Sequence, residues 1–179
     1  VLEQLRNPEI LWETLNDLVQ ENADFKNDFE LKFVGKLDDK ILQKIESSPL
    51  KSNLTNLGYQ THDVALKHMQ DSTVLLMTNF PQESSKGIIP GKIFEYLATG
   101  KTILSFGPKD ADVEKILIET KAGKHFGYDE KENLKKFILE SYQNWKLGML
   151  NQNAENIEQF SRKNLTQKLV DLMNKMVLK

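Results

Sequence analysis

The chain has 179 residues, of which 39% are hydrophobic and 28% are charged, and its formal net charge is −2. This length and balance are typical of one folded domain with a sizeable core, and they exclude a disordered tail and a strongly basic nucleic-acid-binding surface. The sequence has no cysteine, which excludes disulfides and thiolate metal sites and favours a reducing compartment, so we expect a cytoplasmic location.

The first third of the chain alternates helical and extended patterns. Residues 8–19 place apolar side chains on one helical stripe, and Pro8 stands where the start of a helix tolerates proline. Residues 29–35 alternate apolar and polar side chains and end on a glycine, which predicts a strand followed by a tight turn. A short helix is expected over 38–46, and a second, weaker strand over 52–60.

The middle of the chain contains a continuous apolar run. A helix is expected over 61–70, and the run 72–78 predicts a strand that is buried on both faces, near the centre of a parallel sheet. A further helix over 90–99 has a proline near its start and Gly100 just past its end, which is typical of helix boundaries. The apolar residues 101–106 then predict another strand.

The last third continues the same alternation. A helix is expected over 111–121, a short strand over 122–128, a helix over 130–145, and helical structure throughout 151–178. Strands that alternate with helices are typical of βαβ units. The sequence therefore predicts an α/β fold, with a Rossmann-like open parallel sheet and helices on both faces.

The helix over 90–99 is also where we expect a ligand. Open α/β sheets bind ligands at the carboxyl ends of their strands, and the start of a helix in that position attracts phosphate. Lys92 and Glu95 are three residues apart and share one face of this helix within its first two turns. The opposite stripe is expected to be buried and consists of Ile93, Phe94, Leu97 and Ala98.

The loop before this helix is rich in small residues, which allow the backbone to approach an anion closely. Those residues are Ser84, Ser85, Gly87 and Gly91. The alternative is that Lys92 and Glu95 form an exposed ion pair of little energetic value and that the loop binds nothing. Spacing alone does not decide between the two.

The segment GIIPGKIFEYLATGKTIL (87–104) resembles the donor site of the nucleotide-sugar glycosyltransferases with the GT-B fold, in the large retaining group called family 4. The resemblance extends from residue 1 to about 145, because the segments FVG, NLGYQ and DSTVLLMT occur in the same order as in the family. The segment FSRKNLTQKLVDLM (160–173) is similar to the family's closing helices. The resemblance implies that residues 1–179 are one carboxyl-terminal domain that binds a nucleoside-diphosphate sugar. Segment 146–179 would pack back towards an amino-terminal domain that this sequence lacks.

The resemblance also implies roles for single residues. Glu95 matches the glutamate that accepts hydrogen bonds from the ribose hydroxyls, and Arg6 falls where the family has a basic residue that neutralises the diphosphate. Backbone N–H groups of the loop, with Lys92, would hold the phosphates, and the turns at Gly35 and Tyr59 would line the ribose and the base. The expected donor-binding residues are therefore Arg6, Gly35, Tyr59, Ser85, Gly87, Ile88, Gly91, Lys92 and Glu95.

The chain departs from the family pattern at two positions. Gly87 stands where many members have a second glutamate that contacts the donor sugar, and Val1 stands where the second basic residue would be. The family's first strand would end just before Val1, and a sheet without it would have unpaired edges that favour association of the fragment. The start at Val1 rather than at methionine also indicates a piece of a longer protein.

The family implies a sugar transferase of the hexosyl type, but only for the full-length protein. Its acceptor, a polysaccharide or a lipid-linked glycan, would bind to the amino-terminal domain, and peripheral membrane association of the whole protein is compatible with this role. Two alternatives stay open from the residues: half of a nucleotide-sugar epimerase and a noncatalytic α/β interaction domain.

We expect no metal, no cofactor, no nucleic acid and no transmembrane segment. The three histidines, His62, His68 and His125, are too scattered to form a metal site. No apolar run approaches the roughly 20 residues that span a membrane. A nucleoside-diphosphate sugar would therefore be a substrate and the only small molecule required.

Overall fold

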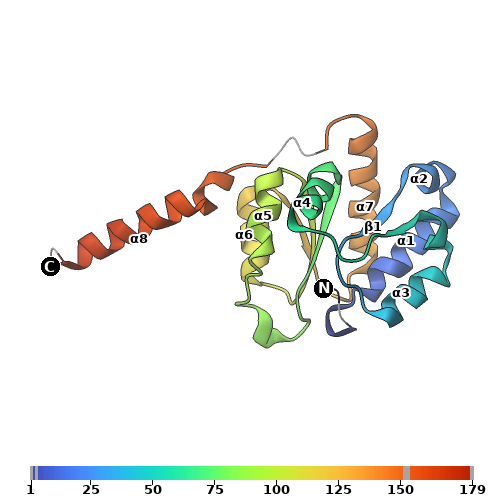
Figure 1. Ribbon diagram of the computed structural model, residues 1–179, viewed down its shortest axis with the longest axis horizontal. Coiled ribbons are helices and arrows are strands. Elements are labelled where there is room, and N and C mark those ends of the chain that lie inside the picture. Colours follow the sequence, from blue (N-terminus) through green and yellow to red (C-terminus); the bar gives the residue numbers. More distant parts are fainter. Residues whose placement is uncertain (1, 3, 151–153, 178–179) are drawn as a thin grey trace.

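The computed structural model describes residues 2, 4–150 and 154–177, and its five strands form two parallel groups with helices on both faces (Figure 1). One group pairs β1 with β2, and the other has the order β3-β4-β5. The strands are β1 (Leu31–Phe33), β2 (Leu54–Asn56), β3 (Val74–Thr78), β4 (Thr102–Phe106) and β5 (Gly123–Phe126). The predicted α/β class is confirmed, and all five predicted strands are present but shorter than expected.

Eight α-helices and four short 3₁₀ helices occur within the described residues. The α-helices are α1 (Glu9–Glu21), α2 (Ala23–Asp28), α3 (Asp39–Glu46), α4 (His62–Asp71), α5 (Lys92–Thr99), α6 (Asp112–Thr120), α7 (Lys131–Lys146) and α8 (Arg162–Val177). The 3₁₀ helices are η1 (Gln4–Arg6), η2 (Pro49–Asn53), η3 (Glu83–Ser85) and η4 (Ile157–Phe160). Each predicted helix up to residue 145 is confirmed within about two residues at its ends.

Two helical assignments differ from the prediction. Helix α2 was not expected: Asn22 Oδ1 accepts a hydrogen bond from the Phe25 backbone and starts a six-residue helix, which is too short to show periodicity. The prediction of continuous helix over 151–178 is wrong, because Asn156 has a left-handed backbone and Ser161 is extended. Asn156 immediately precedes η4, and Ser161 separates η4 from α8.

The three-stranded sheet separates two apolar cores. The central strand β4 directs Leu104 and Phe106 into a core shared with α1, α3 and α7, and it directs Ile103 into a second core with α5 and α6. Trp12 is fully buried in the first core, where its Nε1 donates to Asn7 Oδ1 at 2.6 Å. Helices therefore cover both faces of this sheet, as predicted.

Strand β3 does not lie at the centre of a sheet, which corrects the sequence prediction. It forms one edge of its group, and its side chains alternate, with Leu75 and Met77 buried and Val74 exposed. Within the described residues, β3 pairs with β4 on one side and has no strand neighbour on the other. An isolated parallel bridge joins Leu2 to Leu37, after β1. The strand that the family resemblance implies before Val1 lies outside the described residues.

Helix α5 buries a different stripe from the predicted one. Ile93 and Leu97 are buried as expected, but Phe94 and Ala98 are exposed and Tyr96 is buried in their place. Residues 93, 96 and 97 follow the spacing of one helical face, which packs on the core with α6. Phe94 lies at the margin of this face, with its ring centroid 6.2 Å from that of Phe160.

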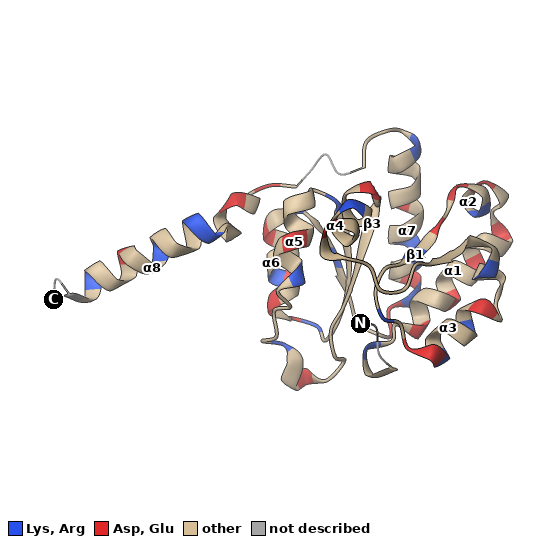
Figure 2. Ribbon diagram, in the orientation of Figure 1, with Lys and Arg blue, Asp and Glu red and all other residues tan. Residues whose placement is uncertain are grey.

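Opposite charges line the contact between α7 and the first two helices (Figure 2). Lys131 Nζ lies 3.1 Å from Asp17 Oδ2, and Lys135 Nζ lies 2.7 Å from Glu21 Oε2. Both lysines are on α7 and both carboxylates are on α1, so the contact orients α7 along α1 on the outside of the first core.

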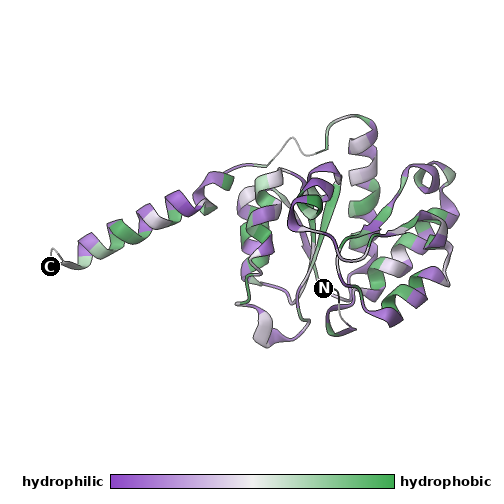
Figure 3. Cartoon of the chain, viewed as in Figure 1, coloured by the Kyte–Doolittle hydropathy of each residue, from purple (hydrophilic) through white to green (hydrophobic). Residues whose placement is uncertain are grey.

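Helix α8 extends away from the rest of the chain (Figure 1), and hydrophobic residues alternate with hydrophilic ones along it (Figure 3). The exposed apolar side chains are Leu165, Leu169, Val170, Leu172, Met173 and Met176. Their spacing places them together on one side of the helix. Among the helices of the described residues, none combines the length and the apolar character needed to cross a membrane.

Candidate functional site

The loops after the five strands meet at one edge of the fold. Gly35 follows β1, Gly58 follows β2, Asn79 follows β3, Gly107 follows β4, and Tyr128 lies two residues after β5. Because the strands of each group are parallel, these residues lie at carboxyl ends, where α/β sheets bind ligands.

The loop before α5 presents backbone donors that have no partner. Between Lys86 and Ile93, all described residues, the N–H groups of Gly87, Ile89, Gly91 and Lys92 make no hydrogen bond. Gly91 caps the helix with its backbone alone, and Gly100 ends the helix with a left-handed φ of 67°, as its sequence position predicted. The amino end of α5 and the loop before it can therefore donate several hydrogen bonds to one anion.

Ser85 and Ile88 hold this loop through hydrogen bonds within the protein, and their predicted contact with the donor stays a prediction. Ser85 is buried, and its Oγ lies 2.7 Å from the Phe80 carbonyl and 2.8 Å from the Gln82 carbonyl. The Ile88 N–H donates to the Ser85 carbonyl at 2.9 Å, and the Ile88 carbonyl accepts from Asn79 Nδ2 at 3.0 Å. Neither residue has a free donor for a phosphate.

Glu95 and Lys92 are both exposed in the first turn of α5. Both side chains belong to the described residues, and no ion pair joins them, although their spacing would allow one. The Lys92 ammonium lies instead 5.9 Å from the ring centroid of Tyr96. The Glu95 carboxylate is accessible for hydrogen bonds from a ligand.

Arg6 is brought to the loop before α5 by a tertiary contact. Its guanidinium lies over the Phe80 ring, 5.1 Å from the centroid, and Phe80 directly follows Asn79. The element that carries Arg6 is bound to the segment after Gly35, because Gln4 Nε2 donates to Asp38 Oδ1 at 3.0 Å. A fixed positive charge is thus held between the ends of β1 and β3.

The two glycine turns of the prediction also meet. The Gly35 N–H donates to the Gly58 carbonyl at 2.7 Å, and both residues have positive φ, which favours glycine. Tyr59, which follows Gly58, is 90% exposed, so its ring is free to stack on a planar group. Within the described residues, no hydrogen bond links this turn to the loop before α5, so the predicted site consists of two separate parts.

The sequence did not identify three residues that join the strand ends. They are Asn79, Phe80 and Tyr128, and the Tyr128 hydroxyl donates to the Asn79 carbonyl at 2.6 Å. Burial raises the pKa of Tyr128, so its hydroxyl remains a donor at neutral pH. The one local signal that could have identified any of them is the position of Asn79, an asparagine directly after an apolar strand.

The sequence matches no protein-family model and no curated protein significantly, but solved structures share its fold. A crystal structure of TarM superposes with a TM-score of 0.65 at 20% identity, over 96% of this chain and 33% of TarM. A crystal structure of WaaG, a glycosyltransferase involved in lipopolysaccharide biosynthesis, superposes with a TM-score of 0.66 at 17% identity, over 94% of this chain and 43% of WaaG. Both have the GT-B fold.

The chain has the fold of one GT-B domain. A TarM mutant from S. aureus, crystallised with Fondaparinux, alpha-GlcNAc-glycerol and UDP, gives a TM-score of 0.65 at 19% identity, over 97% of this chain and 34% of that protein. The chain therefore spans between a third and less than half of the length of these structures. The predicted relation to the GT-B fold is confirmed at the level of the fold.

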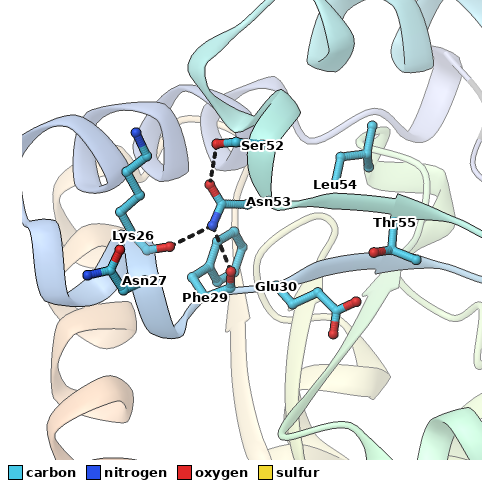
Figure 4. Close-up of a pocket in the computed structure, with 8 residues that line it drawn as sticks. All are labelled: Lys26, Asn27, Phe29, Glu30, Ser52, Asn53, Leu54 and Thr55. Carbon is cyan, nitrogen blue, oxygen red and sulfur yellow. Dashed lines mark hydrogen bonds between the residues drawn. The ribbon is translucent and has the colours of Figure 1, made fainter.

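A cavity of about 350 Å³ lies at the opposite edge of the GT-B domain, before β1 and β2 (Figure 4). Asn53 occupies its wall and donates through Nδ2 to the carbonyls of Lys26 and Phe29, at 2.7 Å each. These polar groups are used to join η2 to α2. The cavity is open and polar, and it lies away from the carboxyl ends of the strands, so it does not coincide with the candidate site.

Among the side chains that the structure describes, no three His, Asp or Glu residues form a group that could hold a metal ion. The expectation that donor binding requires no metal in this domain stays a prediction.

Proposed function

We propose that this chain is the donor-binding domain of a glycosyltransferase that uses a nucleoside-diphosphate sugar. The observation that carries the proposal is the group of unpartnered N–H donors at Gly87, Ile89, Gly91 and Lys92, with the exposed carboxylate of Glu95 one turn further on. A diphosphate requires several converging donors, and a ribose diol suits a carboxylate acceptor.

Each proposed role follows from the chemistry of its side chain. The loop N–H groups and Lys92 bind the diphosphate, and Glu95 accepts hydrogen bonds from the ribose hydroxyls. Arg6 neutralises the charge that develops on the departing nucleoside diphosphate. Gly35 and Tyr59 line the nucleoside, with the exposed Tyr59 ring against the base. The TarM structure that contains UDP supports a nucleotide ligand for this fold.

The complete reaction would need a longer protein, because the chain spans less than half of each GT-B structure compared above. We place this chain in the carboxyl-terminal half, with the acceptor, a polysaccharide or lipid-linked glycan, bound by an amino-terminal domain. The apolar stripe of α8 would pack against that domain. The transferase would be of the retaining hexosyl type and cytoplasmic, and this domain alone would bind nucleotide without transferring sugar.

Calorimetry with UDP, GDP and their sugars tests the proposal. We expect one nucleotide to bind, and Glu95→Ala to weaken that binding about tenfold, which corresponds to about 1.4 kcal/mol. Glu132→Ala is a matched control, because Glu132 is an exposed carboxylate in the first turn of another helix, α7. Unchanged binding in Glu95→Ala would exclude the proposed ribose contact, and no binding by the wild type would exclude the function.

A further inference from the structure

We propose that Asn79 is a positioning residue that fixes both the phosphate-binding loop and the Arg6 guanidinium. The inference rests on the proposed function and assigns to it a residue that contacts neither the nucleotide nor the sugar. Asn79 directly follows β3 and is 4% exposed. A polar side chain with so little exposure requires hydrogen-bond partners on every polar atom.

Asn79 uses all four of its hydrogen-bonding groups. Its backbone N–H donates to the Phe106 carbonyl at 2.8 Å, and its carbonyl accepts from Tyr128 Oη at 2.6 Å. Its side-chain Nδ2 donates to the Ile88 carbonyl at 3.0 Å, and its Oδ1 accepts from the Phe80 N–H at 2.9 Å. The backbone of Asn79 is thus anchored to the ends of β4 and β5, while its amide holds two other segments.

The contact with Ile88 sets the loop before α5. The Ile88 carbonyl is drawn to Asn79, and its N–H is held by Ser85, so both backbone groups of Ile88 are directed into the protein. The N–H groups of its two neighbours, Gly87 and Ile89, have no hydrogen-bond partner among the described residues. Fixing Ile88 therefore fixes the donors on either side of it.

The contact with Phe80 sets the position of Arg6. The Phe80 N–H is bound to Asn79 Oδ1, and the Phe80 carbonyl accepts from Ser85 Oγ, so the backbone beneath this ring is held on both sides. The Arg6 guanidinium lies over that ring at 5.1 Å from the centroid. One amide thereby determines the distance between the loop donors and the cationic side chain.

This geometry requires an amide. Asn79 must donate to one carbonyl and accept from one N–H, which a carboxamide does and a carboxylate cannot. Asn79→Asp keeps the size and the acceptor but loses the donor to Ile88 and places a carboxylate against a carbonyl. Asn53→Asp is the matched control, because Asn53 also donates through Nδ2 to backbone carbonyls, those of Lys26 and Phe29, but at the opposite ends of the strands.

The first test needs no ligand. We expect Asn79→Asp to speed amide hydrogen exchange at Ile88 at least tenfold, with unchanged exchange in the central strand β4, whereas Asn53→Asp leaves the loop unchanged. Should Asn79→Asp not fold, Tyr128→Phe replaces it, because that variant removes only the hydroxyl that donates to the Asn79 carbonyl. Unchanged exchange at Ile88 in a folded variant overturns the inference.

The second test measures the affinity of each variant for UDP or GDP, whichever the wild type binds, and for the matching monophosphate. We expect Asn79→Asp to lower the affinity for the diphosphate about tenfold and to lower the ratio of diphosphate to monophosphate affinity, a change that a general loss of stability does not produce. Tyr128→Phe should act in the same direction by a smaller factor. If the wild type binds and the ratio is unchanged, the positioning role is wrong while the proposed function stands. If the wild type binds no nucleotide, both are wrong.

Discussion

Ser105 and His125 are direct cross-strand neighbours in β4 and β5, and the serine Oγ lies 2.9 Å from the histidine Nδ1. The histidine Nε2 lies 3.1 Å from the Pro108 carbonyl, which can only accept, so Nε2 carries the proton and Nδ1 accepts from the serine. Burial lowers the pKa of His125, and the hydrogen bond to the Pro108 carbonyl and the carboxylates of Glu114 and Glu130 only partly oppose this effect. His125 is therefore neutral in the folded protein at pH 7.

This arrangement predicts a loss of stability in acid. The histidine pKa is near 6.5 in the unfolded chain and lower in the folded protein, so below about pH 6.5 the unfolded state binds more protons and the free energy of unfolding falls. Urea unfolding between pH 7 and pH 5 should show a smaller pH dependence for His125→Gln than for the wild type. His62→Gln, at an exposed position, should retain the wild-type slope; equal slopes in all three proteins would contradict the assignment.

Tyr96 predicts a second pH effect at the alkaline end. Burial raises the pKa of Tyr96 to about 12, with a smaller contribution from Glu95. Because the folded pKa exceeds the unfolded value of about 10, its contribution to stability is complete below pH 10 and is lost as the pH rises towards 12. Tyr96→Phe should show a flatter decrease in the free energy of unfolding between pH 9.5 and 11.5. A decrease as steep as that of the wild type would show that Tyr96 ionises freely.

Two glycines predict opposite responses to the same substitution. A Cβ on Gly123 would lie 2.7 Å from the Ile103 backbone N, inside the β4–β5 ladder, whereas a Cβ on Gly87 would meet no atom within 4 Å. We expect Gly123→Ala to lower the free energy of unfolding by about 3 kcal/mol and Gly87→Ala to change it by less than about 0.5 kcal/mol. Chemical denaturation of both variants measures the difference, and similar stabilities would be inconsistent with the described strand contact.

The exposed stripe of α8 predicts association of the isolated chain. Apolar patches of this kind drive contacts between molecules, and Leu169 and Met173 lie near the middle of the stripe. Sedimentation velocity should detect concentration-dependent association, and Leu169→Lys with Met173→Lys should abolish it. The paired control, Gln167→Lys with Asn174→Lys, adds the same charge on the polar face and should associate like the wild type. A wild type that stays monomeric at all concentrations would contradict this prediction.

Local patterns in the sequence were sufficient for most of the fold. Apolar runs and helical stripes identified all five strands and, except for α2, the α-helices up to residue 145. Gly100 marked the end of α5, because glycine readily adopts the left-handed backbone that ends this helix. The place of β3 could not be predicted in this way. Burial of a strand depends on its neighbours, and the β1 pair and the β3 group share no ladder within the described residues.

The candidate site was predicted in part. The glycine turns at Gly35 and Gly58 were evident from residue types, because each requires a particular backbone geometry, and Pro90 indicated the start of α5 to within two residues. The contacts that assemble the site join residues far apart in sequence, such as Tyr128 with Asn79 and Arg6 with Phe80. No local pattern specifies such pairs, and the inward-facing role of Ser85 was missed for the same reason.

The short segment around η1 touches both groups of strands. Leu2 exchanges backbone hydrogen bonds with Lys36 and Asp38 just after β1, while Arg6 rests on Phe80 just after β3. A dianion bound both by this arginine and by the loop before α5 would link the two groups of strands, which share no backbone pairing. Ligand affinity and the cohesion of the two halves of the fold would then be thermodynamically coupled, so that whatever loosens one weakens the other.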